Sequence, residues 1–164
     1  MLYLRRLNCD DGEEIYNMLQ EIARDDNGFR NKANGMTFDE FRIWLKNEYA
    51  VDNGKLEDWM VPQTSYWLYD GDKPIGYGRI RHYLNDALRE NSGHIGYAIR
   101  KSERGLGYGN RILGLLLEEC KKLEINDVQI SAHDDNIPSN KVIVRNGGIL
   151  KRNTNGKNFY GISI

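Results

Sequence analysis

A run of alternating glycines gives this sequence its clearest pattern with chemical meaning. Gly105, Gly107 and Gly109 alternate with other residue types within residues 104–110. Glycine accepts sharp backbone turns, so such a run can point several N–H groups in one direction. A helix that begins at the end of the run adds its positive dipole end. The pattern therefore predicts a binding site for an anion, most naturally a pyrophosphate.

The segments on either side of the run predict a strand before it and a helix after it. Residues 94–99 are apolar and bounded by polar residues, which is typical of a buried strand. After the run, apolar residues recur at three- and four-residue spacing, which indicates a helix with one buried stripe. These residues are Ile112, Leu113, Leu116, Leu117, Cys120 and Leu123.

The spacing of the glycines decides which phosphate loop this is. A dinucleotide fingerprint GxGxxG that began at Gly107 would need a glycine at the position of Ile112, and no GK[ST] follows for an ATP loop. The residues do fit [QR]xxGx[GA], filled by Arg104, Gly107 and Gly109. This pattern resembles the acetyl-CoA pyrophosphate loop of the GNAT superfamily of acyl-CoA-dependent N-acyltransferases. The alternative is an ordinary glycine-rich turn at a helix start.

Length and composition predict one folded domain over residues 1–164. The chain is 40% hydrophobic, with ten tyrosines, three tryptophans and only three prolines. No apolar run approaches membrane-spanning length, and the N-terminus turns acidic too early for a secretory signal, so we expect a cytoplasmic protein without membrane contact. Cys9 and Cys120 are too few and too unpatterned for a disulfide framework or a metal knuckle, and we expect no metal.

The charge is unevenly distributed along the chain. Residues 1–70 carry 8 Lys/Arg and 14 Asp/Glu, a net charge of −6, whereas residues 71–164 carry 15 and 10, a net charge of +5. One hypothesis is that the acidic half draws in a cationic amine while the basic half holds an anionic cofactor. The alternative is that these are solvated surface charges. The modest total charge gives no support to nucleic-acid binding.

The order of the predicted elements supports the resemblance over nearly the whole chain. A capping box formed by Thr37 and Glu40 marks the start of the second helix. We expect strands near residues 2–7, 65–69, 75–83, 94–99, 128–133, 149–152 and 159–164, helices near 12–24, from 37, after 107 and at 138–146, and loops at 25–36, 52–63 and 85–93. The order β-α-α-β-β-β-α-β-α-β-β is that of the GNAT fold, an α/β (α+β) fold in which four helices flank a mixed, mostly antiparallel sheet of about seven strands.

The resemblance implies a set of residues that bind acetyl-CoA. The loop would hold the pyrophosphate, and the backbone around Ala98 and Ile99 would pair with the pantetheine arm, where a main-chain N–H would polarise the acetyl carbonyl. A second family motif, at the start of the last helix, places Asn136 and Ser139 beside the cofactor. Asn136 could instead cap that helix. The implied loop residues are Arg104, Gly105, Leu106, Gly107, Tyr108, Gly109 and Asn110.

The sequence departs from the family at the usual general acid. Relatives often have a tyrosine where this chain has Ile143, four residues before Gly147, and many have phenylalanine where it has Gly148. Isoleucine has no proton to give to the leaving thiolate. Tyr97 and Tyr108 are possible substitutes, or water or the developing ammonium supplies the proton; either tyrosine could instead have only a packing role.

A base must also keep the attacking amine neutral. His94, at the start of the central strand, is the first candidate because histidine titrates near neutral pH. Asp134 and Asp135 are the alternatives, and a histidine at a strand edge can equally be structural. On a regular strand, His94 and Tyr97 would point to opposite faces.

The resemblance therefore implies direct transfer of an acetyl group from acetyl-CoA to an amine in a ternary complex, without an acyl-enzyme. The acidic residues of the two irregular segments before residue 64 favour a small-molecule amine over a peptide as the acceptor. A homodimer is possible, since paired subunits are common in the superfamily. Two alternatives remain: a degenerate member that binds CoA without turnover, and an interaction domain that binds no cofactor.

Overall fold

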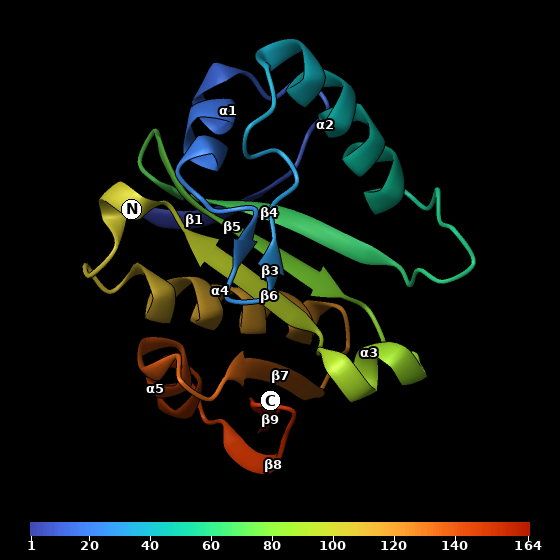
Figure 1. Ribbon diagram of the computed structural model, residues 1–164, viewed down its shortest axis with the longest axis vertical. Coiled ribbons are helices and arrows are strands. Elements are labelled where there is room, and N and C mark those ends of the chain that lie inside the picture. The colour runs from blue at the N-terminus through green and yellow to red at the C-terminus, as the bar shows by residue number, and fades with distance from the viewer.

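The protein is built from three antiparallel sheets, one of them a two-stranded hairpin, and five α-helices (Figure 1). The computed structural model describes all residues 1–164. The elements are β1 (Leu2–Arg6), α1 (Glu13–Gln20), β2 (Asp25–Asp26), β3 (Phe29–Arg30), α2 (Phe38–Asp52), β4 (Gln63–Asp70), β5 (Lys73–Arg81), α3 (Asp86–Asn91), β6 (Ile95–Ile99), the 3-10 turn η1 (Lys101–Glu103), α4 (Tyr108–Lys122), β7 (Asp127–His133), α5 (Ile137–Arg145), β8 (Ile149–Thr154) and β9 (Lys157–Ser163). None of the five α-helices combines the length and the apolar character needed to cross a membrane.

The two larger sheets meet at one point and then part. Their strand orders are β1-β4-β5-β6 and β7-β9-β8, and every paired neighbour is antiparallel. The facing strands β6 and β7 run in the same direction (Figure 1). The His94 N–H donates to the Gln129 carbonyl at 2.8 Å, but β6 and β7 do not form a paired ladder beyond this point. The predicted fold class is confirmed, and the parting of the two strands opens the middle of the molecule.

Two apolar clusters cover opposite faces of the four-stranded sheet. On one face, α4 packs Ile112 and Leu116 against β5, β6 and the three-stranded sheet. On the other face, α1 and α2 cover Trp67 and Tyr77 with residues such as Phe41. Figure 1 shows these helices on the two sides of the sheet. Burial of this apolar surface is the main force that holds β6 in place.

Local sequence signals at α2 and at the last hairpin behave as predicted. The Thr37 hydroxyl accepts from the Glu40 N–H at 3.2 Å, and the Glu40 carboxylate accepts from the Thr37 N–H at 3.0 Å. The capping box is therefore confirmed. The turn between β8 and β9 places Asn155 and Gly156 at φ values of 53° and 75°, as a tight Asn-Gly hairpin turn requires.

The segment predicted as a loop at residues 25–36 contains a small hairpin, β2–β3. Its turn uses Asn27 and Gly28, with φ values of 52° and 92°. Phe29, the first residue of β3, is buried. The fully buried Asn31 amide donates to the carbonyls of Leu19 and Ile22, both at 2.8 Å. These two bonds satisfy carbonyls at the end of α1, which stops at Gln20 rather than at the predicted residue 24.

The segment predicted as a loop at residues 85–93 contains the short helix α3. The Asn85 side chain caps it by accepting from the Leu88 N–H at 2.9 Å. None of its residues is buried. A helix without a buried face has no apolar stripe, so hydrophobic periodicity could not predict it.

Candidate active site

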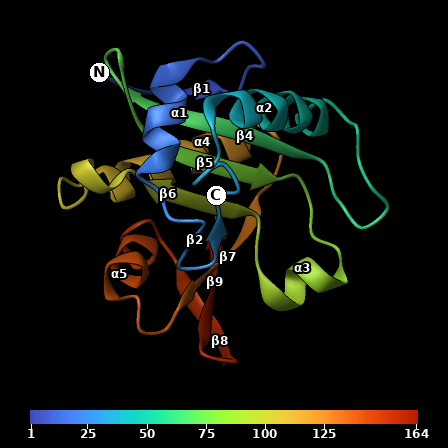
Figure 2. The same ribbon diagram turned by 45° about the horizontal axis from the view of Figure 1, so that its top comes forward.

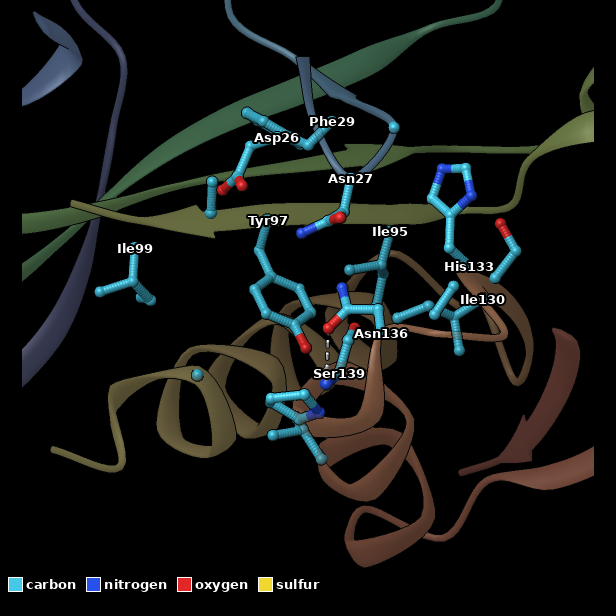
Figure 3. Close-up of a pocket in the computed structure, with 18 of the residues that line it drawn as sticks. Asp26, Asn27, Phe29, Ile95, Tyr97, Ile99, Ile130, His133, Asn136 and Ser139 are labelled. Atoms are coloured by element: carbon cyan, nitrogen blue, oxygen red, sulfur yellow. Dashed lines mark hydrogen bonds between the residues drawn. The ribbon is translucent and has the colours of Figure 1, made fainter. Parts of the chain in front are cut away.

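A cleft of about 760 Å³ runs between β6 and β7 where the two sheets part (Figure 3). Its walls are β6, β7, the glycine loop before α4 and the start of α5. The β2–β3 hairpin crosses β6 and reaches towards β7 (Figure 2), and its residues 26–30 line the cleft. A Cβ added to Gly28 would lie 3.5 Å from His133 Nε2 on β7, and one added to Gly96 on β6 would lie 2.9 Å from the Phe29 ring. The hairpin thus contacts both strands, and the volume matches that of ordinary ligand sites.

The glycine loop presents unpaired N–H groups at one end of the cleft. Gly105 and Gly107 have φ values of 78° and 85°, in the left-handed region that glycine enters without strain. No N–H group of residues 105–110 donates to another group of the protein, and the first that does is Arg111, which bonds the Gly107 carbonyl at 3.3 Å. Together with the N-terminus of α4, six such donors form a site suited to an anion.

All but one of the predicted loop residues line the cleft. The exception is Leu106, which is 66% exposed. The Arg104 guanidinium donates through Nε to the Ile99 carbonyl at 3.0 Å and forms an ion pair with Asp26 at 3.2 Å. Arg104 therefore ties the loop to β6 and to the hairpin. Glu103 forms an ion pair with Lys73.

A second ion pair fixes the chain just before the loop. The Arg100 guanidinium donates two hydrogen bonds to the Glu21 carboxylate, which also accepts from the Ser102 N–H at 3.0 Å. Burial opposes ionisation of Glu21, but these hydrogen bonds outweigh it and lower its pKa to about 2. The end of α1 is thereby attached to the turn that leads into the glycine loop.

The start of α5 supplies the facing wall. The Asn136 side chain caps this helix by accepting from the Ser139 N–H at 3.4 Å, and both residues line the cleft (Figure 3). The capping role that the sequence left open is thus present in the structure. Lys141 and Arg145, further along α5, also line the cleft and make its lining near the loop basic.

Tyr97 on β6 points its hydroxyl into the cleft towards Ser139 (Figure 3). The hydroxyl oxygen is buried without a hydrogen-bond partner, and burial raises the pKa of Tyr97. It therefore keeps its proton at neutral pH. The Tyr108 hydroxyl is engaged instead, since it donates to the Asp70 carboxylate at 2.7 Å, and this hydrogen bond raises its pKa.

The predicted catalytic residues do not come together. His94 lies outside the cleft, and its Nδ1 accepts from the Gln129 N–H at 2.9 Å. Burial lowers the pKa of His94. Asp134 and Asp135 are exposed and do not line the cleft, and Asp134 accepts from Asn153 at 3.2 Å. His94 therefore joins the two sheets at their contact point, and His133 is the only histidine that lines the cleft.

Ile143 and Gly148, the two positions that depart from the family pattern, pack against each other. Ile143 is fully buried in the core and does not line the cleft. A Cβ added to Gly148 would lie 2.5 Å from the Ile143 side chain and 2.8 Å from its carbonyl oxygen. Position 148 must therefore stay small. No proton donor at position 143 would face the cleft in the orientation that Ile143 has here.

The comparisons with known proteins agree with this architecture. The profile of the acetyltransferase (GNAT) domain family matches residues 1–149. The chain belongs to this GNAT family. By that membership it is an N-acetyltransferase. No curated protein matches the sequence.

Solved GNAT structures superpose on almost the whole chain. The GNAT domain of S. lividans PAT gives a TM-score of 0.70 at 13% identity, covering 98% of this chain and 89% of that chain. RimL, a ribosomal L7/L12 alpha-N-protein acetyltransferase in complex with coenzyme A, gives 0.70 at 17%, covering 99% and 94%. Campylobacter jejuni N-acetyltransferase PseH, in complex with acetyl coenzyme A, gives 0.67 at 9%, covering 99% and 99%. At such identities the likeness shows the fold.

Proposed function

We propose that this GNAT protein transfers the acetyl group of acetyl-CoA to a primary amine of a small molecule, directly and within a ternary complex. The observation that carries the proposal is the row of six N–H groups, at residues 105–110, that have no acceptor within the protein and lie at the mouth of the cleft. They would hold the pyrophosphate, with Lys141 and Arg145 adding positive charge on the facing helix.

The edge of β6 offers hydrogen-bonding groups to the pantetheine arm. In an antiparallel pair, alternate residues bond the neighbouring strand. The Arg100 N–H bonds the Ile75 carbonyl at 2.9 Å, and the Arg81 N–H bonds the His94 carbonyl at 2.7 Å, so the even-numbered residues of β6 face β5. The N–H groups of Tyr97 and Ile99 then face the cleft. One of them would polarise the thioester carbonyl.

Two side chains are placed to move protons. As the amine nitrogen bonds the acyl carbon and the carbon–sulfur bond breaks, the sulfur needs a proton, which the Tyr97 hydroxyl would donate. Its hydroxyl has no other acceptor in the protein, and its raised pKa keeps the proton on the oxygen until the sulfur takes it. His133 would accept the proton of the amine, directly or through water. It takes the place that the sequence suggested for His94 because it is the histidine that lines the cleft.

The experiment is thiol release from acetyl-CoA with a panel of small amines and short peptides, with the acetylated product identified by mass. Thiol release with small amines supports the proposal. Acetylation of peptides alone would overturn the small-molecule acceptor. A thermal shift with acetyl-CoA but no thiol release would identify the degenerate member that only binds CoA, and absence of any shift would identify an interaction domain.

A paired measurement tests the choice of base. We expect His133→Ala to remove the acidic limb of the profile of kcat/KM against pH, and His94→Ala to leave that limb in place. The opposite result would return the role to His94. The homodimer and the cytoplasmic location stay predictions.

A further inference from the structure

Two arginines on β5 line the cleft at the end opposite the glycine loop. Arg79 and Arg81 are two residues apart on one strand, so their side chains leave the same face of the sheet. The register places Arg79 opposite Gly96, and Arg81 bonds the backbone next to the contact point of the two sheets. Gly96 lies two residues, or about 7 Å, along β6 from Ala98. The pair therefore lies beyond the expected position of the acetyl group, where an acceptor would bind.

Neither arginine has a carboxylate partner within 4.0 Å. Arg79 donates to the Tyr77 hydroxyl at 3.0 Å and to the Arg30 carbonyl at 3.4 Å, and its guanidinium lies 5.1 Å from the centre of the Phe29 ring. Its Nε is buried without an acceptor. Arg81 donates only to neutral oxygens of Ser92 and Gly93, both at 3.0 Å.

The nearest acidic groups, Asp52 and Glu48, attract Arg79 through space but contact neither arginine. Asp52 already accepts from the Ser65 N–H at 2.8 Å, the Ser65 hydroxyl at 3.1 Å and Gln63 at 3.2 Å. Glu48 forms no ion pair, and burial raises its pKa more strongly than Arg79 lowers it. Neither carboxylate lines the cleft. Burial, followed by the repulsion of Arg79, lowers the pKa of Arg81 to about 10, so both arginines are charged at neutral pH.

Two half-buried positive charges with no carboxylate in contact favour the binding of an anion between them. We propose that Arg79 and Arg81 bind an anionic group of the acceptor, so that the substrate is a small primary amine that carries a carboxylate or a phosphate. This inference rests on the proposed transfer to a small-molecule amine. The separation of about 7 Å along β6 indicates that several bonds lie between the amine and the anion.

The charges that line the cleft are opposite to those of the acidic acceptor pocket expected from the sequence. Residues 52–63 do not line the cleft at all. The acidic residues that do, Asp26 and Glu103, are both in ion pairs with basic side chains. The charges at this end that have no ion-pair partner are basic, namely Arg79, Arg81 and Lys157, and they favour an anionic acceptor over a polycation.

The test compares amines that differ only in the group at the far end. The probes are 4-aminobutyrate, 4-aminobutanamide and 1,4-diaminobutane, with 2-aminoethyl phosphate as the phosphate counterpart, and thiol release from acetyl-CoA is the readout. We expect kcat/KM for an anionic amine to exceed that for the neutral amide by roughly ten- to a hundredfold, through KM, with the diamine the poorest. Whichever of the carboxylate and the phosphate is preferred identifies the anion.

Variants assign the effect to the pair. Arg79→Gln should lower kcat/KM for the anionic amine much more than for the amide, so that the ratio of the two values falls towards one. Arg42→Gln makes the same charge change on exposed α2, outside the cleft, and should alter neither rate. Loss of the thermal shift with acetyl-CoA would show that Arg79→Gln has not folded. In that case Arg81→Gln, measured with the same amines, decides whether the pair binds the anionic group.

The outcomes separate this inference from the proposed function. Equal or better acetylation of the amide or the diamine by the wild-type protein would overturn the anionic acceptor and leave the acetyltransferase standing. An equal loss for all amines in the arginine variants would also overturn it. Absence of thiol release with every amine would overturn the proposed function itself.

Discussion

The left-handed backbone of Gly107 gives the sharpest test of the glycine loop. We expect Gly107→Ala to weaken acetyl-CoA binding with little change in the free energy of unfolding. An added Cβ at residue 107 meets no atom within 4 Å, so the substitution causes no clash. It only opposes a φ of 85°. An alanine in that region costs about 1–2 kcal/mol.

That cost appears in binding because, in the free protein, no hydrogen bond from the N–H groups of residues 105–110 fixes the backbone of this segment. The N–H groups of residues 105–110 make no bond within the protein, so the loop of the variant can relax to negative φ. It must return to the left-handed form for its N–H groups to converge on the pyrophosphate. A cost of about 1–2 kcal/mol corresponds to a dissociation constant roughly 5- to 30-fold higher, measurable by calorimetric titration with acetyl-CoA.

Gly35 provides a matched control with the same backbone conformation outside the cleft. Its φ is 86°, an added Cβ again meets no atom within 4 Å, and its N–H is held by the Gln20 side chain at 2.8 Å. We expect Gly35→Ala to lower the free energy of unfolding in urea by about 1 kcal/mol and to bind acetyl-CoA normally. If Gly107→Ala instead lost stability like the control and kept its affinity, the loop would not be the pyrophosphate site that we describe.

Three further predictions test other parts of the cleft and its supports. Tyr97→Phe should lower kcat roughly a hundredfold in steady-state assays without weakening acetyl-CoA binding, and its urea stability should not fall, because the lost hydroxyl has no partner. Wild-type protein should lose stability as pH falls from 4.5 towards 2, through the range in which Glu21 takes up a proton and releases Arg100. Glu21→Gln should remove about 1 kcal/mol of that loss, after allowance for partial exposure, when urea unfolding is compared at about pH 5 and about pH 3. Gly148→Ala should lower the free energy of unfolding by about 1–3 kcal/mol, because its new methyl group meets Ile143 at 2.5 Å, and normal stability in urea would contradict this packing.

The features that could be predicted from the sequence are those that depend on near neighbours in the chain. The helix after the glycine loop, the capping box at Thr37 and the turn at Asn155 are each specified within a few residues. The glycine spacing led to the correct family for the same reason. The loop offers its own N–H groups to a ligand, so its pattern is contained in a few consecutive residues. The predicted order of elements along the chain followed from these local signals, and it lacked only β2, β3 and the short helices α3 and η1.

Tyr97, Asn136 and Ser139 were named from the sequence and line the cleft, but other side chains of the cleft could not be predicted, because their surroundings are set by distant segments. His94 was favoured for its place on a central strand, but whether its ring meets the cleft or Gln129 depends on where β6 touches β7. His133 had no local pattern to mark it. Lys141 and Arg145 are ordinary exposed positions of a helix until that helix is placed beside the loop.

The hairpin β2–β3 shows most clearly how such a site depends on tertiary structure. From the sequence, Arg79 and Arg81 alternate with small and apolar residues on β5, which is equally typical of a strand with one solvated face. In the structure this face of β5 is covered by Phe29. The Phe29 ring stacks on Arg79 and packs on Gly96, so it covers both the arginine and the strand that lines the cleft. Asp26 in the same hairpin bonds Arg104. One short hairpin therefore contacts the glycine loop at one end of the cleft and the arginine pair at the other, which gives the two proposed binding sites a shared structural support.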